Sequence, residues 1–118
     1  MINIDRKTPS VEDSRGSLVE FDSTNLEQVN ILFSKKNTVR GNHYHTKLIE
    51  LFYIIKGDLT LELTDVKSNE FSSIEIKTGD YFEVLPFTNH TLKFNEDTQI
   101  LVGYNEKFDP ADPDIYVL

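Results

Sequence analysis

The chain is predicted to be all-β, with short strands closing into a β-sandwich or barrel. Apolar and β-branched runs recur about every 8 to 12 residues, separated by turn residues. Two tight turns, at Lys56–Asp58 and Lys77–Asp80, separate apolar strands, with Gly57 expected to supply a positive φ. Helical periodicity is weak throughout. At 118 residues the chain is expected to form one domain, residues 1–118.

The predicted strands follow the runs that alternate or are rich in apolar residues. They are Ser17–Phe21, Gln28–Phe33, Thr38–His45, Glu50–Ile55, Leu59–Thr64, Phe71–Ile76, Tyr81–Leu85, Thr91–Phe94 and Gln99–Tyr104. The strand from Glu50 is apolar on both faces, with Phe52 and Ile54 on one side and Leu51 and Tyr53 on the other. Either the N-terminal strands or a second subunit must cover its outer face. We predict a homodimer.

Composition excludes several classes of partner and site. Twelve Lys and Arg residues against twenty Asp and Glu give a net charge of −8, which disfavours nucleic acid and anionic membranes. The chain has no cysteine, so any metal site must use nitrogen and oxygen ligands. No signal peptide or membrane-spanning run is apparent, and a soluble cytoplasmic protein is expected.

All three histidines stand where they could share one site. His43 and His45 are two residues apart, Glu50 follows on the next predicted strand, and His90 comes from a strand further along. Three imidazoles and one carboxylate suit a divalent cation such as zinc, iron, manganese or nickel. No organic cofactor is predicted. The alternative is that these are hydrogen-bonded polar side chains in a wet barrel mouth.

The spacing of these residues resembles the first cupin motif. His43-x-His45, four residues, Glu50, six residues and Gly57 match it without a gap. The second motif is similar at Gly79-Asp80 and at Leu85–His90, although Phe87 stands where the motif has glycine. The resemblance implies a double-stranded β-helix, the jelly-roll barrel of the cupins.

Three segments resemble one branch of the cupins. Arg40–His45 reads Arg-Gly-Asn-His-Tyr-His and is similar to strings in dTDP-4-dehydrorhamnose 3,5-epimerases, in dTDP-4-keto-6-deoxyhexose 3,4-ketoisomerases and in the C-terminal cupin domain of capsular polysaccharide assembly enzymes. Asp13–Glu20 resembles an N-terminal string of the epimerases, and Asn105–Asp114 resembles the C-terminal ending of the same group of enzymes. The resemblance implies epimerisation or keto-isomerisation of a nucleotide-linked 4-keto-6-deoxy sugar in polysaccharide or deoxysugar biosynthesis. It also implies that Arg40 contacts the diphosphate and that His43 lies at the reacting carbon.

A phosphate-bearing substrate needs local positive charge in so acidic a chain. Arg40 and Lys47 flank the first histidine pair and are the candidate substrate-binding residues, although lysines here could equally be solvated surface charges. Simple alternation places Arg40 and His43 on opposite faces of their strand. Only a bulge at Gly41 would bring both to one pocket.

Protons next to a ketone become acidic when the developing enolate oxygen is stabilised, and a metal held by His43, His45, Glu50 and His90 could polarise that oxygen. A metal-bound His43 cannot also accept the proton, so a second group is needed, for which Tyr104 is the candidate. Without a metal, His43 becomes the base.

Two other classes remain open. Three histidines and a glutamate also suit a cupin dioxygenase that uses iron(II), with open positions for oxygen. A non-catalytic sugar-binding module would keep the pocket without turnover.

Overall fold

The described residues, 4–6, 9–21 and 25–118 of the computed structural model, form eleven strands and no helix. The strands in chain order are β1 (Ile4–Arg6), β2 (Val11–Asp13), β3 (Gly16–Leu18), β4 (Gln28–Ser34), β5 (Val39–His43), β6 (Glu50–Lys56), β7 (Asp58–Asp65), β8 (Phe71–Lys77), β9 (Asp80–Val84), β10 (Thr88–Phe94) and β11 (Thr98–Tyr104).

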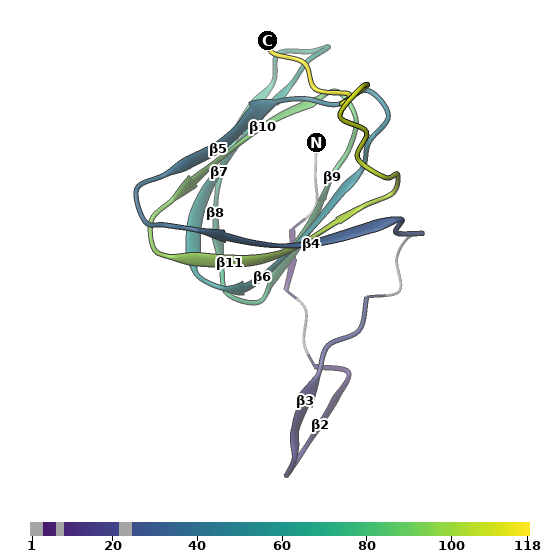
Figure 1. Ribbon diagram of the computed structural model, residues 1–118. Coiled ribbons are helices and arrows are strands. Elements are labelled where there is room, and N and C mark those ends of the chain that lie inside the picture. The colour runs from purple at the N-terminus through teal and green to yellow at the C-terminus, as the bar shows by residue number, and fades with distance from the viewer. Residues whose placement is uncertain (1–3, 7–8, 22–24) are drawn as a thin grey trace.

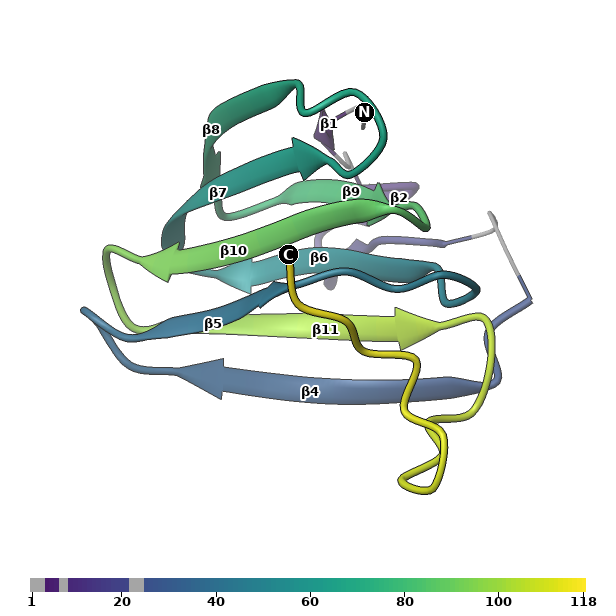
Figure 2. The same cartoon turned by 90° about the horizontal axis from the view of Figure 1, so that it is seen from above.

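Two antiparallel sheets face each other and form the barrel (Figures 1 and 2). One has the order β1-β9-β6-β11-β4 and the other the order β5-β10-β7-β8. Strands β2 and β3 form a separate hairpin that stands away from the barrel in Figure 1. Apart from the consecutive pair β7 and β8, the neighbouring strands of these two sheets are distant in sequence, as in a jelly roll. The predicted all-β cupin barrel is confirmed.

Alternating side chains of the two sheets fill the core. Leu59, Leu61 and Leu63 on β7 are at most 1% exposed and belong to the same cluster as Phe52 and Phe82 on the opposite sheet. The alternation predicted for β7 is therefore confirmed. Burying each such side chain stabilises the fold by about 1.5–3 kcal/mol.

The predicted strands agree with the observed ones except near the ends and at the N-terminus. The short strands β1 and β2 were not predicted, because three residues give too little alternation to recognise. Strand β10 begins at Thr88, three residues earlier than the predicted Thr91, so His90 lies within the strand and not just before it. Strand β5 ends at His43, so His45 lies just beyond the strand and not inside it.

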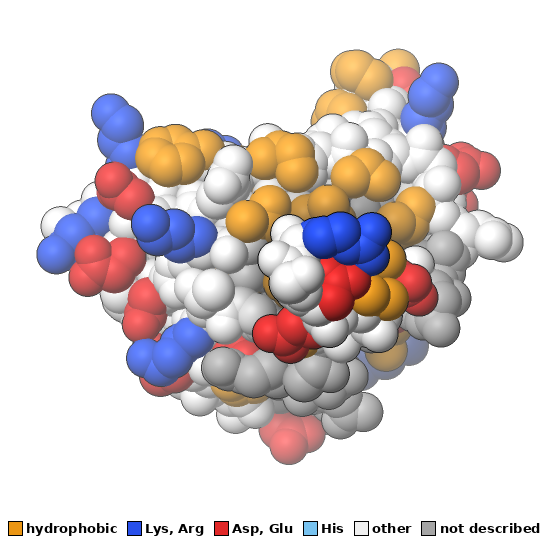
Figure 3. All heavy atoms as spheres, turned by 90° about the horizontal axis from the view of Figure 1, so that it is seen from below, with side chains coloured by type: hydrophobic (Ala, Val, Ile, Leu, Met, Phe, Trp, Pro, Cys, Tyr) orange, Lys and Arg blue, Asp and Glu red, His pale blue; other side chains and the backbone are white. Residues whose placement is uncertain are grey.

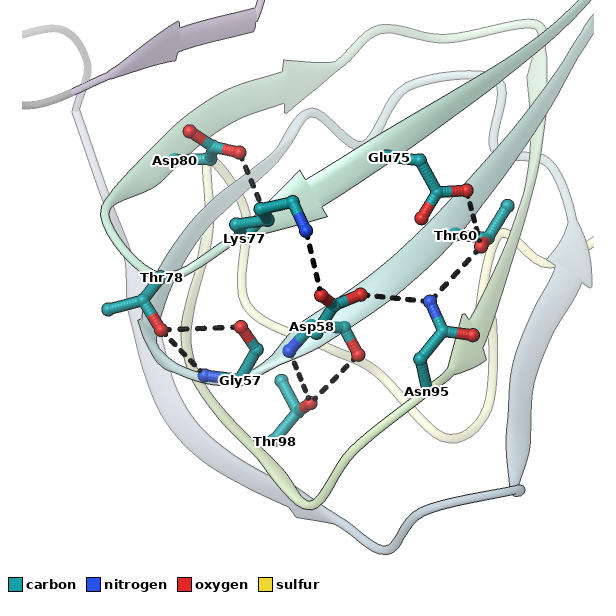
Figure 4. A network of polar contacts seen from close by, with 9 residues as sticks. All are labelled: Gly57, Asp58, Thr60, Glu75, Lys77, Thr78, Asp80, Asn95 and Thr98. Atoms are coloured by element: carbon teal, nitrogen blue, oxygen red, sulfur yellow. Dashed lines mark hydrogen bonds and ion pairs between the residues drawn. The ribbon is translucent and has the colours of Figure 1, made fainter.

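A polar network closes the end of the barrel where β6 runs into β7 (Figure 4). Asp58 accepts hydrogen bonds from the side chains of Asn95 at 2.9 Å and Lys77 at 3.1 Å. Gly57 has φ +142°, and a Cβ there would lie 2.3 Å from Oγ1 of Thr98. Glycine is therefore required at this turn. Glu50, at the start of β6, lies at the opposite end.

The outer face of the five-stranded sheet is only partly covered. The ring of Phe21, from the N-terminal segment, lies 5.0 Å from that of Tyr53 on β6. On the edge strand β4, however, Val29, Ile31 and Phe33 are between 52% and 58% exposed. Hydrophobic side chains gather on this side of the molecule in Figure 3. Phe21 thus covers part of β6, while the described residues of the N-terminal segment leave β4 exposed.

Within the part of the chain that the structure describes, no helix has the length and apolar character needed to cross a membrane.

Candidate metal centre

Four side chains predicted to share a site converge at the open end of the barrel. The ligand atoms of His43, His45, Glu50 and His90 all lie within 4.8 Å of one another. His43 ends β5 and is paired in register with His90 on β10, while Glu50 begins β6 on the other sheet. His45 lies in the turn that joins β5 to β6. Both sheets therefore contribute to the cluster.

A β-bulge next to His43 sets the direction of this part of β5. His43 pairs with His90 and Gly41 with Thr91, so Asn42 is an extra residue. Gly41 and Asn42 have φ angles of +86° and +62°, in the left-handed region. The bulge brings Arg40 and His43 to one cavity, where unbroken alternation would have separated them. A bulge at Gly41 was the condition that the sequence set for a pocket shared by Arg40 and His43, and the structure has one there.

The rings of His45 and His90 are held in the orientation that metal ligands need. Nδ1 of His45 lies 2.7 Å from the carbonyl oxygen of Asp114, and Nδ1 of His90 lies 3.1 Å from that of Thr88. A carbonyl accepts, so each Nδ1 carries the proton. Each Nε2 then faces Glu50, in contact for His45 and at 3.7 Å from Oε1 for His90. A backbone partner on the distal nitrogen is typical of metal-binding histidines, so the donor set fits a divalent cation.

Without a cation, His45 and Glu50 form a buried ion pair. Burial disfavours the charge on His45, but its contact with Glu50 and the carbonyl of Asp114 outweigh burial and raise the pKa of His45. Burial likewise acts to raise the pKa of Glu50, and the hydrogen bond from His45 and the nearby histidines reverse this and lower it. A bound cation would replace the proton shared by this pair.

The other two histidines are neutral at pH 7. Burial, together with repulsion from the positive charge that His90 and His45 carry when protonated, lowers the pKa of His43 from 6.5 to about 4. Burial also lowers the pKa of His90. Their nitrogen lone pairs are therefore available at neutral pH, as metal binding demands.

A cavity of about 640 Å³ opens above the cluster, within the range of small-molecule sites. His43, Glu50 and His90 line it together with Arg40 and Tyr104. Apolar residues of β4, β6, β10 and β11, with Asn30 and Gly41, form the rest of its wall. His45 is 3% exposed and lies behind these residues. The cavity thus combines a cationic side chain, the cluster and a phenol.

Residues of β4 form hydrogen bonds with both Tyr104 and Arg40. Burial, and then the charge of Glu50, raise the pKa of Tyr104, against a hydrogen bond with Asn30 that lowers it. The phenol therefore keeps its proton at neutral pH and can donate it. Nε of Arg40 donates to Oγ of Ser34 at 3.2 Å, which anchors the guanidinium at the cavity wall.

Lys47, the other candidate for substrate binding, is exposed in the turn between β5 and β6. Among the described residues, it is not one of those that line the cavity. Its backbone nitrogen donates to Asp114 at 2.8 Å, which fixes the turn and leaves the side chain outside.

Sequence reasoning missed two supports of this site. Phe87 takes the place of the motif glycine and has φ +61°, the conformation that glycine would adopt freely. Its backbone nitrogen donates to the carbonyl of His45 at 2.7 Å. The replacement of the motif glycine by Phe87 was visible in the sequence and could have pointed to this residue. Asp114, whose carbonyl holds the His45 ring, gave none, because it lies 69 residues away.

A jelly-roll barrel with three histidines and a glutamate at its open end defines this protein as a cupin. The chain belongs to the family described as the polysaccharide biosynthesis C-terminal domain, whose model matches residues 11–116. A search of curated protein sequences gave no match.

Several solved structures share the fold. The TDP-quinovose 3,4-ketoisomerase WlaRB of Campylobacter jejuni has a TM-score of 0.85 at 20% identity, over 99% of this chain and 92% of that one. The dTDP-4-dehydrorhamnose 3,5-epimerase of Sulfolobus tokodaii has 0.73 at 22%, over 86% and 69%. The capsular polysaccharide assembling protein CapF of Staphylococcus aureus has 0.72 at 27%, over 95% of this chain and 32% of CapF. The chain thus spans about a third of CapF.

Proposed function

We propose that this protein is an isomerase of a nucleotide-linked 4-keto-6-deoxy sugar, and that it moves the proton on the carbon next to the ketone. One observation carries the proposal: Arg40, the histidine–glutamate cluster and Tyr104 line a single cavity. The three structural neighbours act, by their names, on nucleotide-linked sugars or assemble a capsular polysaccharide.

The four-residue cluster is proposed to hold zinc or another divalent cation, through Nε2 of His45 and His90, one oxygen of Glu50 and a nitrogen of His43. When bound, the cation supplies Lewis-acid stabilisation of a developing enolate oxygen. His45 and His90 would hold their orientation through Asp114 and Thr88.

In the cation-free site, His43 is proposed to accept the proton next to the ketone and Tyr104 to donate one to the enolate; with a cation on His43, a base from solvent must accept that proton. The low pKa of His43, about 4, makes it a weak base, which favours its role as a ligand when a cation is present. In the cation-free protein its lone pair would instead be directed at the substrate. Tyr104 is protonated at neutral pH because its pKa is raised. It is suited to deliver a proton to the carbon or to the oxygen of the enolate.

Arg40 is proposed to bind the diphosphate of the substrate. It lines the cavity on the β5 side, and a guanidinium can form two parallel hydrogen bonds with phosphate oxygens. Lys47 lies outside the cavity, so its proposed contribution is limited to attracting the anionic nucleotide from solution.

A second copy of the chain is proposed to cover the exposed face of β4, giving a homodimer. Val29, Ile31 and Phe33 form an uncharged stripe on an open sheet edge. Because each copy carries a net charge of −8, an uncharged patch is the surface on which two copies can meet with the least repulsion. A twofold axis pairs such a patch with itself. The β2–β3 hairpin also exposes Val11 and Leu18 and is too small to be stable alone.

The direct test is to incubate the zinc-loaded protein with dTDP-4-keto-6-deoxyglucose and to identify the product sugar by NMR. A changed configuration at carbon 3 or 5, or a 3-keto sugar, supports the proposal.

A second candidate function is that of a binding module without turnover. It is favoured by the match to a family described as a C-terminal domain, and by the fact that this chain covers only 32% of CapF. Tight binding of the nucleotide sugar with no product would favour the module. Oxygen consumption by an iron-loaded sample would favour a dioxygenase.

A further inference from the structure

We propose that Asp114 is a positioning residue of the metal centre. It holds the turn that joins His45 to Glu50, and it fixes the His45 ring. The inference rests on the proposed metal centre, but its geometry can be tested on the metal-free protein.

The carboxylate of Asp114 organises the turn between β5 and β6. Oδ1 accepts from the backbone nitrogen of Thr46 at 2.9 Å and from its hydroxyl at 2.7 Å. Oδ2 accepts from the backbone nitrogens of Lys47 at 2.8 Å and Leu48 at 2.9 Å. Three successive N–H groups pointing at one carboxylate form an anion nest. The turn therefore owes its shape to a residue near the C-terminus.

The same C-terminal segment also fastens both ends of this turn. Tyr44, before the turn, exchanges backbone hydrogen bonds with Tyr116 at 2.9 and 3.0 Å. Ile49, after the turn, donates to Oδ1 of Asn105 at 2.8 Å. The C-terminal segment, residues 105–116, is thus hydrogen-bonded to the barrel both before and after Asp114.

The backbone of Asp114 acts directly on the site. Its carbonyl oxygen accepts from Nδ1 of His45 at 2.7 Å, so the proton stays on Nδ1 and Nε2 faces Glu50. Asp114 has φ +50°, an unfavourable conformation for a residue other than glycine. In this conformation the carbonyl of Asp114 accepts from the His45 ring while its carboxylate accepts from the turn. Loss of the carboxylate would loosen the turn, and we expect the carbonyl of Asp114 then to hold His45 less firmly.

His45 is the ligand most dependent on such support. His43 and His90 lie in paired strands, whereas His45 lies in the turn. Outer residues that orient a metal-binding histidine typically account for 10- to 100-fold in metal affinity.

The test compares Asp114→Asn with Asp112→Asn, a neighbouring exposed residue in which the same charge is lost. Zn²⁺ affinity is measured by competition with a chromophoric chelator. In parallel, the Nδ1–H proton of His45 is observed by NMR in chelator, where only three histidines need assignment. We expect Asp114→Asn to lower Zn²⁺ affinity 10- to 100-fold and to lose the protected Nδ1–H signal by exchange with water. Asp112→Asn should match the wild type in both.

The outcomes separate this inference from the metal proposal. If the wild type binds no Zn²⁺, the metal centre is wrong, and the Nδ1–H signal alone tests Asp114. If folded Asp114→Asn keeps both the affinity and the signal, Asp114 is not a positioning residue. Equal losses in Asp112→Asn would also overturn the inference, because charge alone would explain them. Should Asp114→Asn fail to fold, Thr46→Val removes a single bond to Asp114. It should weaken Zn²⁺ binding several-fold and speed exchange of that proton, and wild-type values would overturn the inference.

Discussion

Gly41 lies against the carbonyl of His90, and a Cβ at position 41 would come within 2.6 Å of that oxygen. The contact joins the bulge of β5 to the strand that carries a candidate ligand. The bulge is what turns Arg40 and His43 toward one cavity. The shape of the site therefore depends on the absence of a side chain at Gly41.

Gly41→Ala should destabilise the fold and the site more than Gly79→Ala does. Both glycines have similar positive φ angles, +86° and +89°, but a Cβ at Gly79 meets nothing within 4 Å. The control thus reports only the backbone cost, about 1–2 kcal/mol. Gly41→Ala should add about 1–3 kcal/mol from overpacking and should weaken nucleotide-sugar binding. Urea unfolding and calorimetry measure the two effects, and equal losses in both variants would refute the role of the contact.

Metal removal should destabilise the wild type but not His90→Ala. At a hundredfold excess of metal over Kd, binding to the folded state adds about 2.7 kcal/mol to the free energy of unfolding. We expect this difference between zinc-loaded and chelated samples in the wild type and almost none in the variant. Comparing each protein with its own chelated form removes the packing cost of the substitution. A variant that gains as much from zinc as the wild type would exclude His90 as a ligand.

In chelator, the protein should lose stability as the pH falls from 6.5 toward 4. The pKa of His43 is about 4 in the folded protein and 6.5 without the fold, so the unfolded chain binds its proton first. His90 acts in the same direction. The raised pKa of His45 acts oppositely, since its stabilisation is present at low pH and is lost as pH rises.

His43→Gln isolates the first of these contributions. Its free energy of unfolding, measured in urea at intervals across this range, should fall less steeply with decreasing pH than that of the wild type. Parallel curves for the two proteins would show that His43 does not titrate abnormally in the folded state.

Phe33→Glu should dissociate the proposed dimer, whereas Phe71→Glu should not. The two phenylalanines are 56% and 58% exposed, but they lie on β4 and β8, in different sheets. A charge in the centre of an apolar interface should weaken association at least tenfold, because burying a Phe contributes about 1.5–3 kcal/mol. Light scattering over a range of concentrations gives the masses. A monomeric wild type, or equal behaviour of the two variants, contradicts the proposed interface.

Short-range patterns in the sequence carried most of the fold and the core of the site. Alternation in Leu59–Thr64 placed three leucines inward, and the motif spacing brought His43, His45, Glu50 and His90 together. The need for a bulge at Gly41 also followed from alternation, because Arg40 and His43 could not otherwise share a cavity.

Contacts between distant segments could not be predicted in the same way. Asp114 reaches His45 across 69 residues, and no local pattern distinguishes its carboxylate from the other acidic groups of the tail. The exposure of Lys47 depends on the turn that Asp114 holds, so its place outside the cavity was equally hidden. The N-terminal cover of β6 depends on the ring of Phe21, which meets Tyr53 only in the folded barrel.

The most direct test of the central claim is exchange of the proton next to the ketone. Nucleotide-linked 4-keto-6-deoxy sugars are incubated with the protein in deuterated water, and the ring protons are followed by NMR. The account predicts exchange well above the protein-free rate, even where net turnover is slow, with loss of exchange in His43→Asn and weaker binding in Arg40→Ala. Losing the proposed contact of Arg40 with the diphosphate should cost about 1.5–3 kcal/mol of binding free energy. Tight binding of these sugars without exchange above the protein-free rate would contradict the account.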